Sequence, residues 1–323
     1  MVPAAAAIPL SLYVHFPWCV RKCPYCDFNS HTLRGELPED QYIDALIGDL
    51  DFELSNMPAE PAPARPLRSI FFGGGTPSLF SGRALGRLLE HAAARLRFAH
   101  DIEITLEANP GTADAGNFRD YRAAGVNRLS IGLQSLDDAQ LRQLGRIHDR
   151  AAAVAAVAMA RSAGFDNINL DLMFALPGQT PAQAQAELRA ALELAPEHLS
   201  YYQLTIEPNT EFARRPPKLP EDEDAWTIQQ AGRELLDAHG YAQYEVSAYA
   251  RPGRQCRHNR NYWEFGDYIG IGAGAHGKLS GGGAIRRRAR RQNPRSFFEG
   301  AGSAAAVLED VAVGAADRRL SSR

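Results

Sequence analysis

The sequence has few cysteines, almost no net charge and no long apolar run, and each shortage excludes a class of protein. The 323 residues include four cysteines, placed too unevenly for the disulfide framework of a secreted domain. The 35 basic and 38 acidic residues nearly balance, which indicates no obligatory nucleic-acid or anionic-membrane partner. No stretch reaches the roughly 18 apolar residues of a membrane helix, and the start lacks the charged region of a signal peptide. We therefore expect a soluble, cytoplasmic protein.

Short apolar runs alternate with longer amphipathic segments over the first two thirds of the chain. Runs rich in Ile, Val, Leu, Phe and Tyr predict strands at Ser11–Phe16, Ser69–Phe72, Ile102–Glu107, Arg128–Gln134, Ile168–Phe174 and Leu199–Ile206. The segments between them predict helices, among them Pro38–Leu54, Gly82–Leu96, Ala113–Ala124, Arg150–Ala163 and Pro181–Leu194. Repeated strand–helix units indicate an α/β fold with a parallel sheet. Six units predict a partial (β/α)6 barrel, with an open doubly wound sheet as the alternative.

Polar residues stand at or just beyond the ends of successive predicted strands. They are the cysteines near the first strand, the segment Gly73–Pro77, and the side chains of Glu107, Gln134 and Asp171. In a βα barrel the carboxyl ends of the strands form one face, so these groups would converge there. In an open sheet they would spread along a crevice. The pattern therefore favours the barrel.

Three of the four cysteines, Cys19, Cys23 and Cys26, follow the first predicted strand with the spacing C-x₃-C-x₂-C. Such clustering in a cytosolic chain indicates a metal site. Structural zinc needs four closed ligands, and no fourth Cys or His completes a local zinc pattern. Three thiolates on a cubane cluster instead leave one iron open for a substrate. A zinc site that borrows His15 or His31 is the alternative.

The cysteine segment Tyr13–Phe28 resembles the loop that follows the first strand in the radical S-adenosylmethionine (radical SAM) superfamily. The resemblance implies a [4Fe–4S] cluster on Cys19, Cys23 and Cys26 that binds SAM and cleaves it reductively. The segment Phe71–Pro77 resembles the family's GGGTP segment, and consecutive glycines allow a close approach of backbone to ligand. The same resemblance implies SAM contacts from Tyr13, Tyr25, Gly74, Gly75, Thr76, Glu107, Gln134, Arg146 and Asp171. For each residue taken singly, the alternative is a satisfied polar group or core packing.

Within the superfamily, residues 8–280 look like the HemW and HemN group of heme chaperones and oxygen-independent coproporphyrinogen III dehydrogenases. The dehydrogenases typically have a further cysteine two residues after the triplet, where this chain has Phe28. The stretch from His258 to Trp263 resembles the HNxxYW segment of the chaperones. Imidazole is a common axial ligand of heme iron, and flat rings suit a porphyrin face. The resemblance implies a heme site at His258, Asn259, Tyr262 and Trp263; the alternative is a buried cluster that holds the last barrel segment.

The resemblance to the chaperones implies delivery of heme to acceptor hemoproteins, including membrane respiratory enzymes, and a homodimer. The alternative function is that of the dehydrogenases, radical oxidative decarboxylation of the propionates of coproporphyrinogen III. Whether SAM is turned over, and hence whether the protein is an enzyme, is left open by the sequence.

Composition divides the chain into three regions. Residues 1–215 are expected to form the partial barrel with the cluster and SAM site. Residues 216–280 are expected to cover the barrel and to carry the heme motif, with a helix from Glu221 to about His239 and a strand-like Ala242–Tyr249. Residues 281–323, with the basic run Arg286–Arg291, are expected to be an irregular, partly disordered tail. Similar proteins usually continue into a C-terminal helical domain, so we expect the tail to be a short, truncated extension.

Overall fold

A single large sheet of twelve strands organises the molecule, of which the computed structural model describes residues 8–57, 65–112 and 115–314. Its centre is parallel. In spatial order the parallel strands are β11 (Asp267–Ile271), β1 (Leu10–Phe16), β4 (Leu67–Gly74), β5 (Phe98–Ala108), β6 (Arg128–Gln134), β7 (Ile168–Phe174) and β8 (His198–Gln203). Antiparallel strands extend both edges: β10 (Ala248–Ala250) and β9 (Ala242–Gln243) beyond β8, and β12 (His276–Gly281), β13 (Ala284–Arg290) and β14 (Val307–Gly314) beyond β11.

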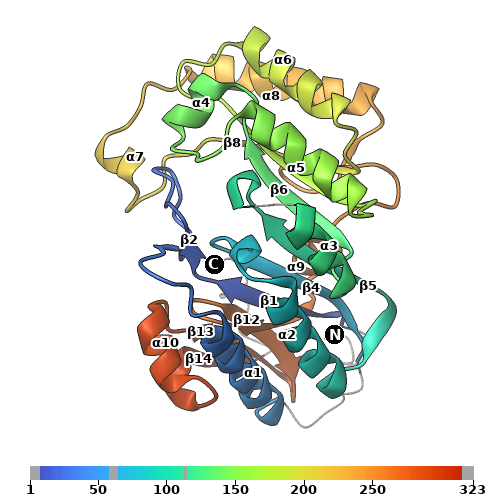
Figure 1. Cartoon of the computed structure of the whole chain (residues 1–323), viewed down its shortest axis with the longest axis vertical. Coiled ribbons are helices and arrows are strands. Elements are labelled where there is room, and N and C mark those ends of the chain that lie inside the picture. The colour runs from blue at the N-terminus through green and yellow to red at the C-terminus, as the bar shows by residue number, and fades with distance from the viewer. Residues whose placement is uncertain (1–7, 58–64, 113–114, 315–323) are drawn as a thin grey trace.

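Helices follow one side of this sheet from α1 round to α8 (Figure 1). They are α1 (Glu39–Ser55), α2 (Gly82–Arg95), α3 (Ala115–Ala123), α4 (Asp138–Gln143), α5 (Arg150–Ser162), α6 (Pro181–Glu193), α7 (Glu211–Arg214) and α8 (Asp222–Ala238). Two more helices follow, α9 (Arg257–Trp263) and α10 (Pro294–Gly300), and short 3-10 turns lie at Pro77–Leu79, Pro110–Thr112 and Ala304–Ala306. A separate two-stranded sheet joins β2 (Trp18–Cys19) to β3 (His31–Thr32).

Strand β1 shows how the alternation of side chains builds two different faces. Phe16 is fully buried and its ring packs edge-on against Tyr42 of α1, so this face of the sheet carries the helices. Tyr13 and His15 point to the opposite face, because successive side chains of a strand alternate. There α9 packs against β1 and β4. The helical side is thus an apolar core, and the other side holds polar groups.

The sheet curls round this polar side into an open barrel. Gln134 of β6 donates its amide to the hydroxyl of Tyr202 in β8, 3.4 Å away across β7. The backbone amide of Cys256, at the start of α9, donates to the hydroxyl of Tyr244 at 3.2 Å, while a backbone amide of the same helix donates to Glu103 of β5 at 2.9 Å. One short helix therefore contacts both β5 and the region beyond β8, which a flat sheet would not allow. The predicted partial barrel is confirmed, and α9 lies inside it.

The sequence located the six barrel strands and their helices closely. Strands β6 and β7 have the predicted limits, and the other barrel strands differ by a few residues. The strand-like stretch Ala242–Tyr249 is a difference, because it forms β9, a turn and β10. Its middle reverses direction so that β9 and β10 pair with each other, antiparallel. Alternation of apolar residues alone did not reveal this reversal.

The expectation of an irregular tail is wrong for the part of it that is described. Residues 284–290 form β13, which is joined to β12 by the turn Gly282–Gly283 with positive φ at both glycines, as a two-residue hairpin requires. Strand β14 then pairs with β13 along its length. Residues 315–323 lie outside the described part of the chain.

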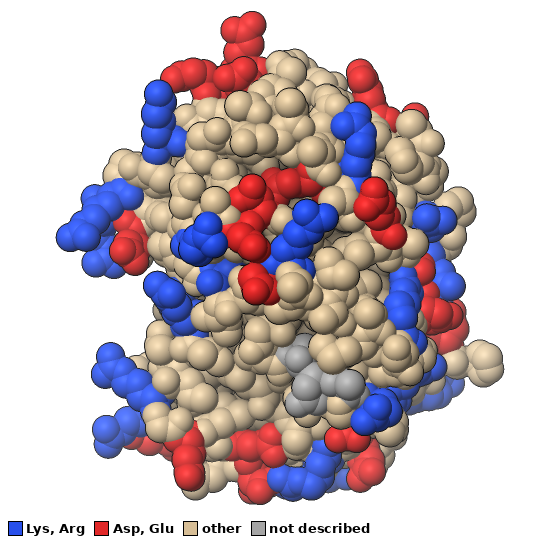
Figure 2. Space-filling model, turned by 45° about the horizontal axis from the view of Figure 1, so that its top comes forward, with Lys and Arg blue, Asp and Glu red and all other residues tan. Residues whose placement is uncertain are grey.

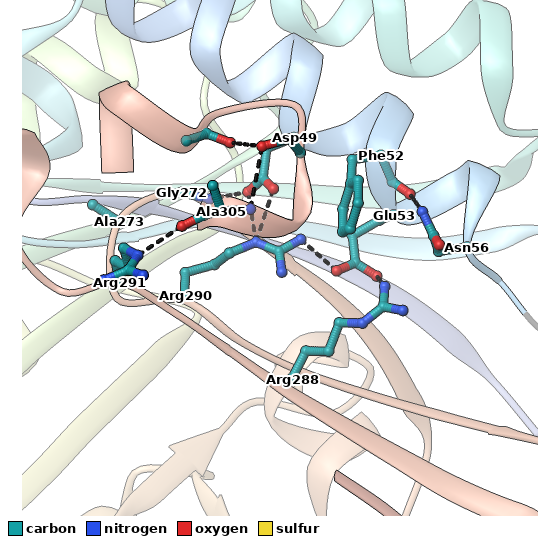
Figure 3. A network of polar contacts seen from close by, with 12 residues as sticks. Asp49, Phe52, Glu53, Asn56, Gly272, Ala273, Arg288, Arg290, Arg291 and Ala305 are labelled. Atoms are coloured by element: carbon teal, nitrogen blue, oxygen red, sulfur yellow. Dashed lines mark hydrogen bonds and ion pairs between the residues drawn. The ribbon is translucent and has the colours of Figure 1, made fainter. Parts of the chain in front are cut away.

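The arginines of β13 explain why this segment is ordered. Arg290 pairs with Asp49 at 2.8 Å and with Glu53, and Arg288 pairs with Glu53 at 2.8 Å, all of them buried (Figure 3). Asp49 also accepts the backbone amide of Gly272 at 3.0 Å. We call these residues, Asp49, Glu53, Arg288 and Arg290, the α1–β13 clamp. The basic run is therefore a structural clamp rather than a solvated tail.

No helix among the described ranges is long and apolar enough to span a bilayer. On the face shown in Figure 2, acidic and basic side chains are interspersed rather than gathered into an area of one sign. This mixture agrees with the nearly balanced charge of the sequence.

Candidate functional site

A cavity of about 280 Å³ lies at the carboxyl ends of the barrel strands. It is lined by every residue that the sequence predicted for the cluster and SAM except Tyr13: Cys19, Cys23, Tyr25, Cys26, Gly74, Gly75, Thr76, Glu107, Gln134, Arg146 and Asp171. These residues come from segments up to about 150 positions apart and meet because parallel strands end on one side of a barrel. The predicted convergence is therefore found.

The cysteine loop is folded back on itself by hydrogen bonds. The amide of Cys26 donates to the carbonyl of Cys23 at 3.1 Å, and the ammonium of Lys22 donates to the carbonyls of Phe28 and Ser30 at 3.0 and 3.1 Å. Burial raises the pKa of the Cys26 thiol. Lys22 thus links the middle of the cysteine loop to its end and constrains the backbone that carries the three thiols.

The three thiols share a cavity but do not converge on a point. Across the described ranges, no three His, Cys, Asp or Glu side chains are grouped closely enough to hold a single metal ion. Zinc ligands lie about 2.0–2.3 Å from one centre, whereas the thiolates of a cubane cluster bind separate irons. Neither His15 nor His31, which the zinc alternative would borrow, lines the cavity.

The glycine segment at the end of β4 passes against the start of the cysteine loop. The amide of Gly75 donates to the carbonyl of Phe16 at 2.6 Å, and a Cβ on Gly75 would come within 2.8 Å of that oxygen. Gly74 has φ +108°, and a Cβ there would come within 2.6 Å of the His15 ring. No side chain fits at either position, because it would strike the chain's own atoms, and both glycines line the cavity.

Two carboxyl groups face the cavity from β5 and β7. Glu107 accepts the amide of Gly74 at 3.1 Å, and burial, with the nearby charge of Asp171, raises its pKa to about 8. Asp171 accepts hydrogen bonds from the hydroxyl of Ser130 at 3.1 Å and the amide of Asn169 at 2.8 Å. Two carboxyl groups with free acceptor capacity suit a ligand that brings a cation and hydroxyl groups.

Gln134 and Arg146 complete the wall beside Cys23. Gln134 has φ 62°, an uncommon left-handed conformation for a residue with a side chain, and its Oε1 has no hydrogen-bond partner among the described residues. Arg146 donates to the carbonyl of Gly132 at 2.9 Å and approaches the sulfur of Cys23 at 3.5 Å. An unpaired amide oxygen and a buried guanidinium at the cavity are polar groups positioned for a ligand.

Sequence reasoning missed Tyr202, which lines the cavity from the end of β8 and accepts the amide of Gln134. It stands in the middle of the sixth predicted strand, Leu199–Ile206, and near the carboxyl end only of the observed strand, which stops at Gln203. The tyrosine was overlooked because an aromatic residue inside an apolar strand looks like core.

The predicted heme residues do not form one surface. His258 is only 5% exposed and its ring stacks on Phe71, with ring centres 4.5 Å apart. Tyr262 and Trp263, in contrast, are 41% and 57% exposed. Tyr13 belongs to the buried group, because its ring stacks on that of His258 at 5.8 Å. The buried-cluster alternative therefore describes His258 but not Tyr262 and Trp263, whose rings are exposed.

Comparison with known proteins identifies the family of this chain. The model of the radical SAM superfamily matches residues 13–191. The heme chaperone HemW of Escherichia coli is 55% identical over 293 residues, covering 90% of this chain and 76% of that protein, and HemW of Haemophilus influenzae is 53% identical over the same shares. Among solved structures, the coproporphyrinogen III oxidase HemN of Escherichia coli, a radical SAM enzyme, matches with a TM-score of 0.80 at 27% identity, over 96% of this chain and 74% of that one. The chain belongs to the radical SAM superfamily and, within it, to the HemW-type proteins.

Proposed function

We propose that this protein is a heme chaperone that binds a [4Fe–4S] cluster, SAM and heme and passes the heme to acceptor hemoproteins. The observation that carries the proposal is the identity of more than half of the aligned residues to proteins named heme chaperone HemW, over 90% of the chain. Similarity of this extent reaches beyond the cavity into β11 and α9. The acceptors in this proposal are respiratory hemoproteins, including those of membranes, and the chaperone acts as a homodimer.

In this proposal Cys19, Cys23 and Cys26 hold the cluster. A cluster on three thiolates supplies one open iron for the amine and carboxylate of SAM, and an electron for cleavage of its sulfonium bond. The support from the structure is that the three thiols open on the cavity that the glycine segment and the carboxyl groups also line.

The chain's own residues then orient SAM. The segment Gly74, Gly75 and Thr76, which lines the cavity, receives the methionyl amine. Glu107 and Asp171 accept hydrogen bonds from the cationic amine and from ribose hydroxyls, and the fork of Arg146 suits a carboxylate. Gln134, with its unpaired oxygen, offers an acceptor to the nucleoside, and Tyr25 and Tyr202 close the wall. Tyr13, which does not line the cavity, supports these residues from behind.

Heme in this proposal binds at α9. The exposed rings of Tyr262 and Trp263 offer apolar area to the porphyrin, and Asn259 lies one turn earlier on the same helix. The imidazole of His258 is neutral at physiological pH, because burial lowers its pKa to about 3. A neutral imidazole is the form that ligates iron, yet its ring is covered, so ligation by His258 requires it to leave its present place.

A second candidate is radical decarboxylation of coproporphyrinogen III, which the likeness to HemN favours. Phe28 weighs against it. This side chain is 60% exposed and lines the cavity where the dehydrogenases typically have a further cysteine, and a phenyl ring cannot act as a thiolate.

One experiment separates the two candidates. The reconstituted protein is incubated without oxygen with reductant, SAM and coproporphyrinogen III, and mass spectrometry follows the tetrapyrrole. In parallel, heme-loaded protein is mixed with an apo-hemoprotein acceptor. The chaperone proposal predicts an unchanged tetrapyrrole and an acceptor that gains heme faster than from free hemin. Formation of protoporphyrinogen would overturn it in favour of the enzyme.

A further inference from the structure

His258 is part of an aromatic stack inside the barrel. Its ring lies 4.5 Å from that of Phe71 with 20° between the planes, and 5.8 Å from that of Tyr13 with 24° between the planes. Tyr262 meets the ring edge-on at 4.9 Å. The Nδ1 atom has no hydrogen-bond partner among the described residues. The side chain is only 5% exposed, so heme iron does not reach the ring in this conformation, although a buried nitrogen of the ring is unused.

The stack ends at the cysteine loop. The hydroxyl of Tyr13 lies 2.9 Å from Nδ1 of His15, and Nε2 of His15 lies 2.8 Å from the carbonyl oxygen of Asn29, three residues beyond Cys26. A carbonyl oxygen only accepts hydrogen bonds, so Nε2 must carry the proton. In the neutral ring Nδ1 then accepts from Tyr13. One arrangement of protons satisfies all three groups.

The same histidine supports the glycine segment. The His15 ring lies within 2.6 Å of the point that a Cβ of Gly74 would occupy, so the ring and this backbone are in tight contact. The amide of Gly74 in turn donates to Glu107 at 3.1 Å. A shift of His15 would therefore reach both the cysteine loop and the glycine segment. We call Tyr13, His15, Phe71 and His258 the aromatic brace.

We propose that His258 is a positioning residue for the cysteine loop, acting through Tyr13 and His15, and that ligation of heme iron by His258 disengages it from the aromatic brace. The second half of the inference rests on the proposed heme binding. Buried in the brace, His258 is out of reach of a heme; once it has moved out to ligate iron, it no longer supports Tyr13. By linkage, heme and SAM then weaken each other's binding by the same factor. Loss of two aromatic contacts predicts a factor of roughly ten.

The test uses the full chain with its cluster reconstituted, and hemin as the probe. SAM affinity is measured by equilibrium dialysis with and without hemin for wild type and for His258→Phe, which keeps a flat ring in the brace but cannot ligate. We expect hemin to weaken SAM binding to wild type roughly tenfold and to leave the variant unchanged. His239→Phe, which removes an exposed histidine at the end of α8, is the matched control and should behave as wild type.

A second variant tests the positioning role without hemin. Tyr13→Phe keeps every ring contact and removes only the hydroxyl that donates to His15. We expect its reduced cluster to show an altered electron paramagnetic resonance signal with SAM, and faster loss of iron to a chelator. A variant indistinguishable from wild type in both measurements would overturn the positioning role.

The outcomes for the two proposals differ. If hemin shifts the Soret band of wild type but leaves its SAM affinity unchanged, ligation of heme does not disengage His258 from the brace. That result overturns the inference and leaves the proposed chaperone function standing. The absence of any Soret shift in wild type overturns heme binding itself. Hemin that weakens SAM binding equally in His258→Phe also overturns the inference, because the effect would not pass through ligation by His258.

Discussion

The α1–β13 clamp makes a strong prediction about stability. Arg290 is 1% exposed and lies between Asp49, fully buried, and Glu53, 4% exposed (Figure 3). Arg290→Ala leaves Asp49 in a low-dielectric place without a cation, while Glu53 keeps only Arg288. Removal of one partner from a buried ion pair costs about 3–5 kcal/mol, because the remaining charge stays desolvated. Through the usual unfolding entropy of a chain this long, about 4 kcal/mol lowers the melting temperature by roughly 6 °C.

The chain offers a matched control for this substitution. Arg295 pairs with Glu299 one helical turn away at 3.3 Å, with 89% and 67% of the two side chains exposed. Screened by water, such a pair contributes about 0.5 kcal/mol or less, so Arg295→Ala should melt within about 1 °C of wild type. Arg290→Lys keeps the charge without the fork and should fall between wild type and Arg290→Ala.

Thermal unfolding of the cluster-free protein, followed by circular dichroism, measures these differences. The reasoning is refuted if Arg290→Ala and Arg295→Ala lower the melting temperature equally. That result would mean that the carboxyl groups of α1 find water or another donor once the arginine has gone, and that β13 is held by its strand pairing alone.

Three further predictions follow from the cavity. Gly74→Ala should destabilise the protein by about 1–3 kcal/mol more than Gly125→Ala in urea unfolding, since both have φ near +108° but only the first would strike a buried ring. Cys26→Ala should abolish the cluster absorbance after reconstitution, whereas Cys256→Ala, at a buried thiol outside the cavity, should retain it. Because the pKa of Glu107 is raised to about 8 in the folded protein, its protonated form stabilises the fold. This stabilisation is complete below pH 4.5, the ordinary pKa, and is lost as the pH rises through about 8. The advantage of Glu107→Gln over wild type in ligand-free unfolding should therefore grow across that window, by up to about 1.4 kcal/mol per pH unit.

The barrel and its cavity could be predicted because their signals are local. A short apolar run identifies a strand such as β7, and the alternation of side chains gives the face of the strand on which Asp171 lies. The rule that parallel strands end on one face then brings distant residues together without any knowledge of their contacts. The cysteine spacing adds chemistry that no packing requirement explains.

The parts that could not be predicted depend on partners far away in the sequence. The run Arg286–Arg291 looks like a solvated basic tail until Asp49 and Glu53, more than 230 positions earlier, lie against it. The burial of His258 could not be predicted from the sequence either. Its motif suggests a surface ligand, and only the packing of α9 inside the barrel shows that Phe71 covers its ring. The composition of a segment does not show whether it is buried, because burial depends on which other segments pack against it.

The clamp and the cavity are not independent, and Asn29 shows why. Its side-chain amide donates to the carbonyls of Ala273 and Gln292, at 2.9 and 3.0 Å, while its own carbonyl accepts from His15. The end of the cysteine loop is therefore held from one side by β1 and from the other by the segments that flank β12 and β13. Because Arg290 lies two residues before Gln292, loosening the clamp should also loosen the loop. Segments that do not line the cavity thus hold Asn29 at the end of the cysteine loop, so the barrel strands alone do not position that loop.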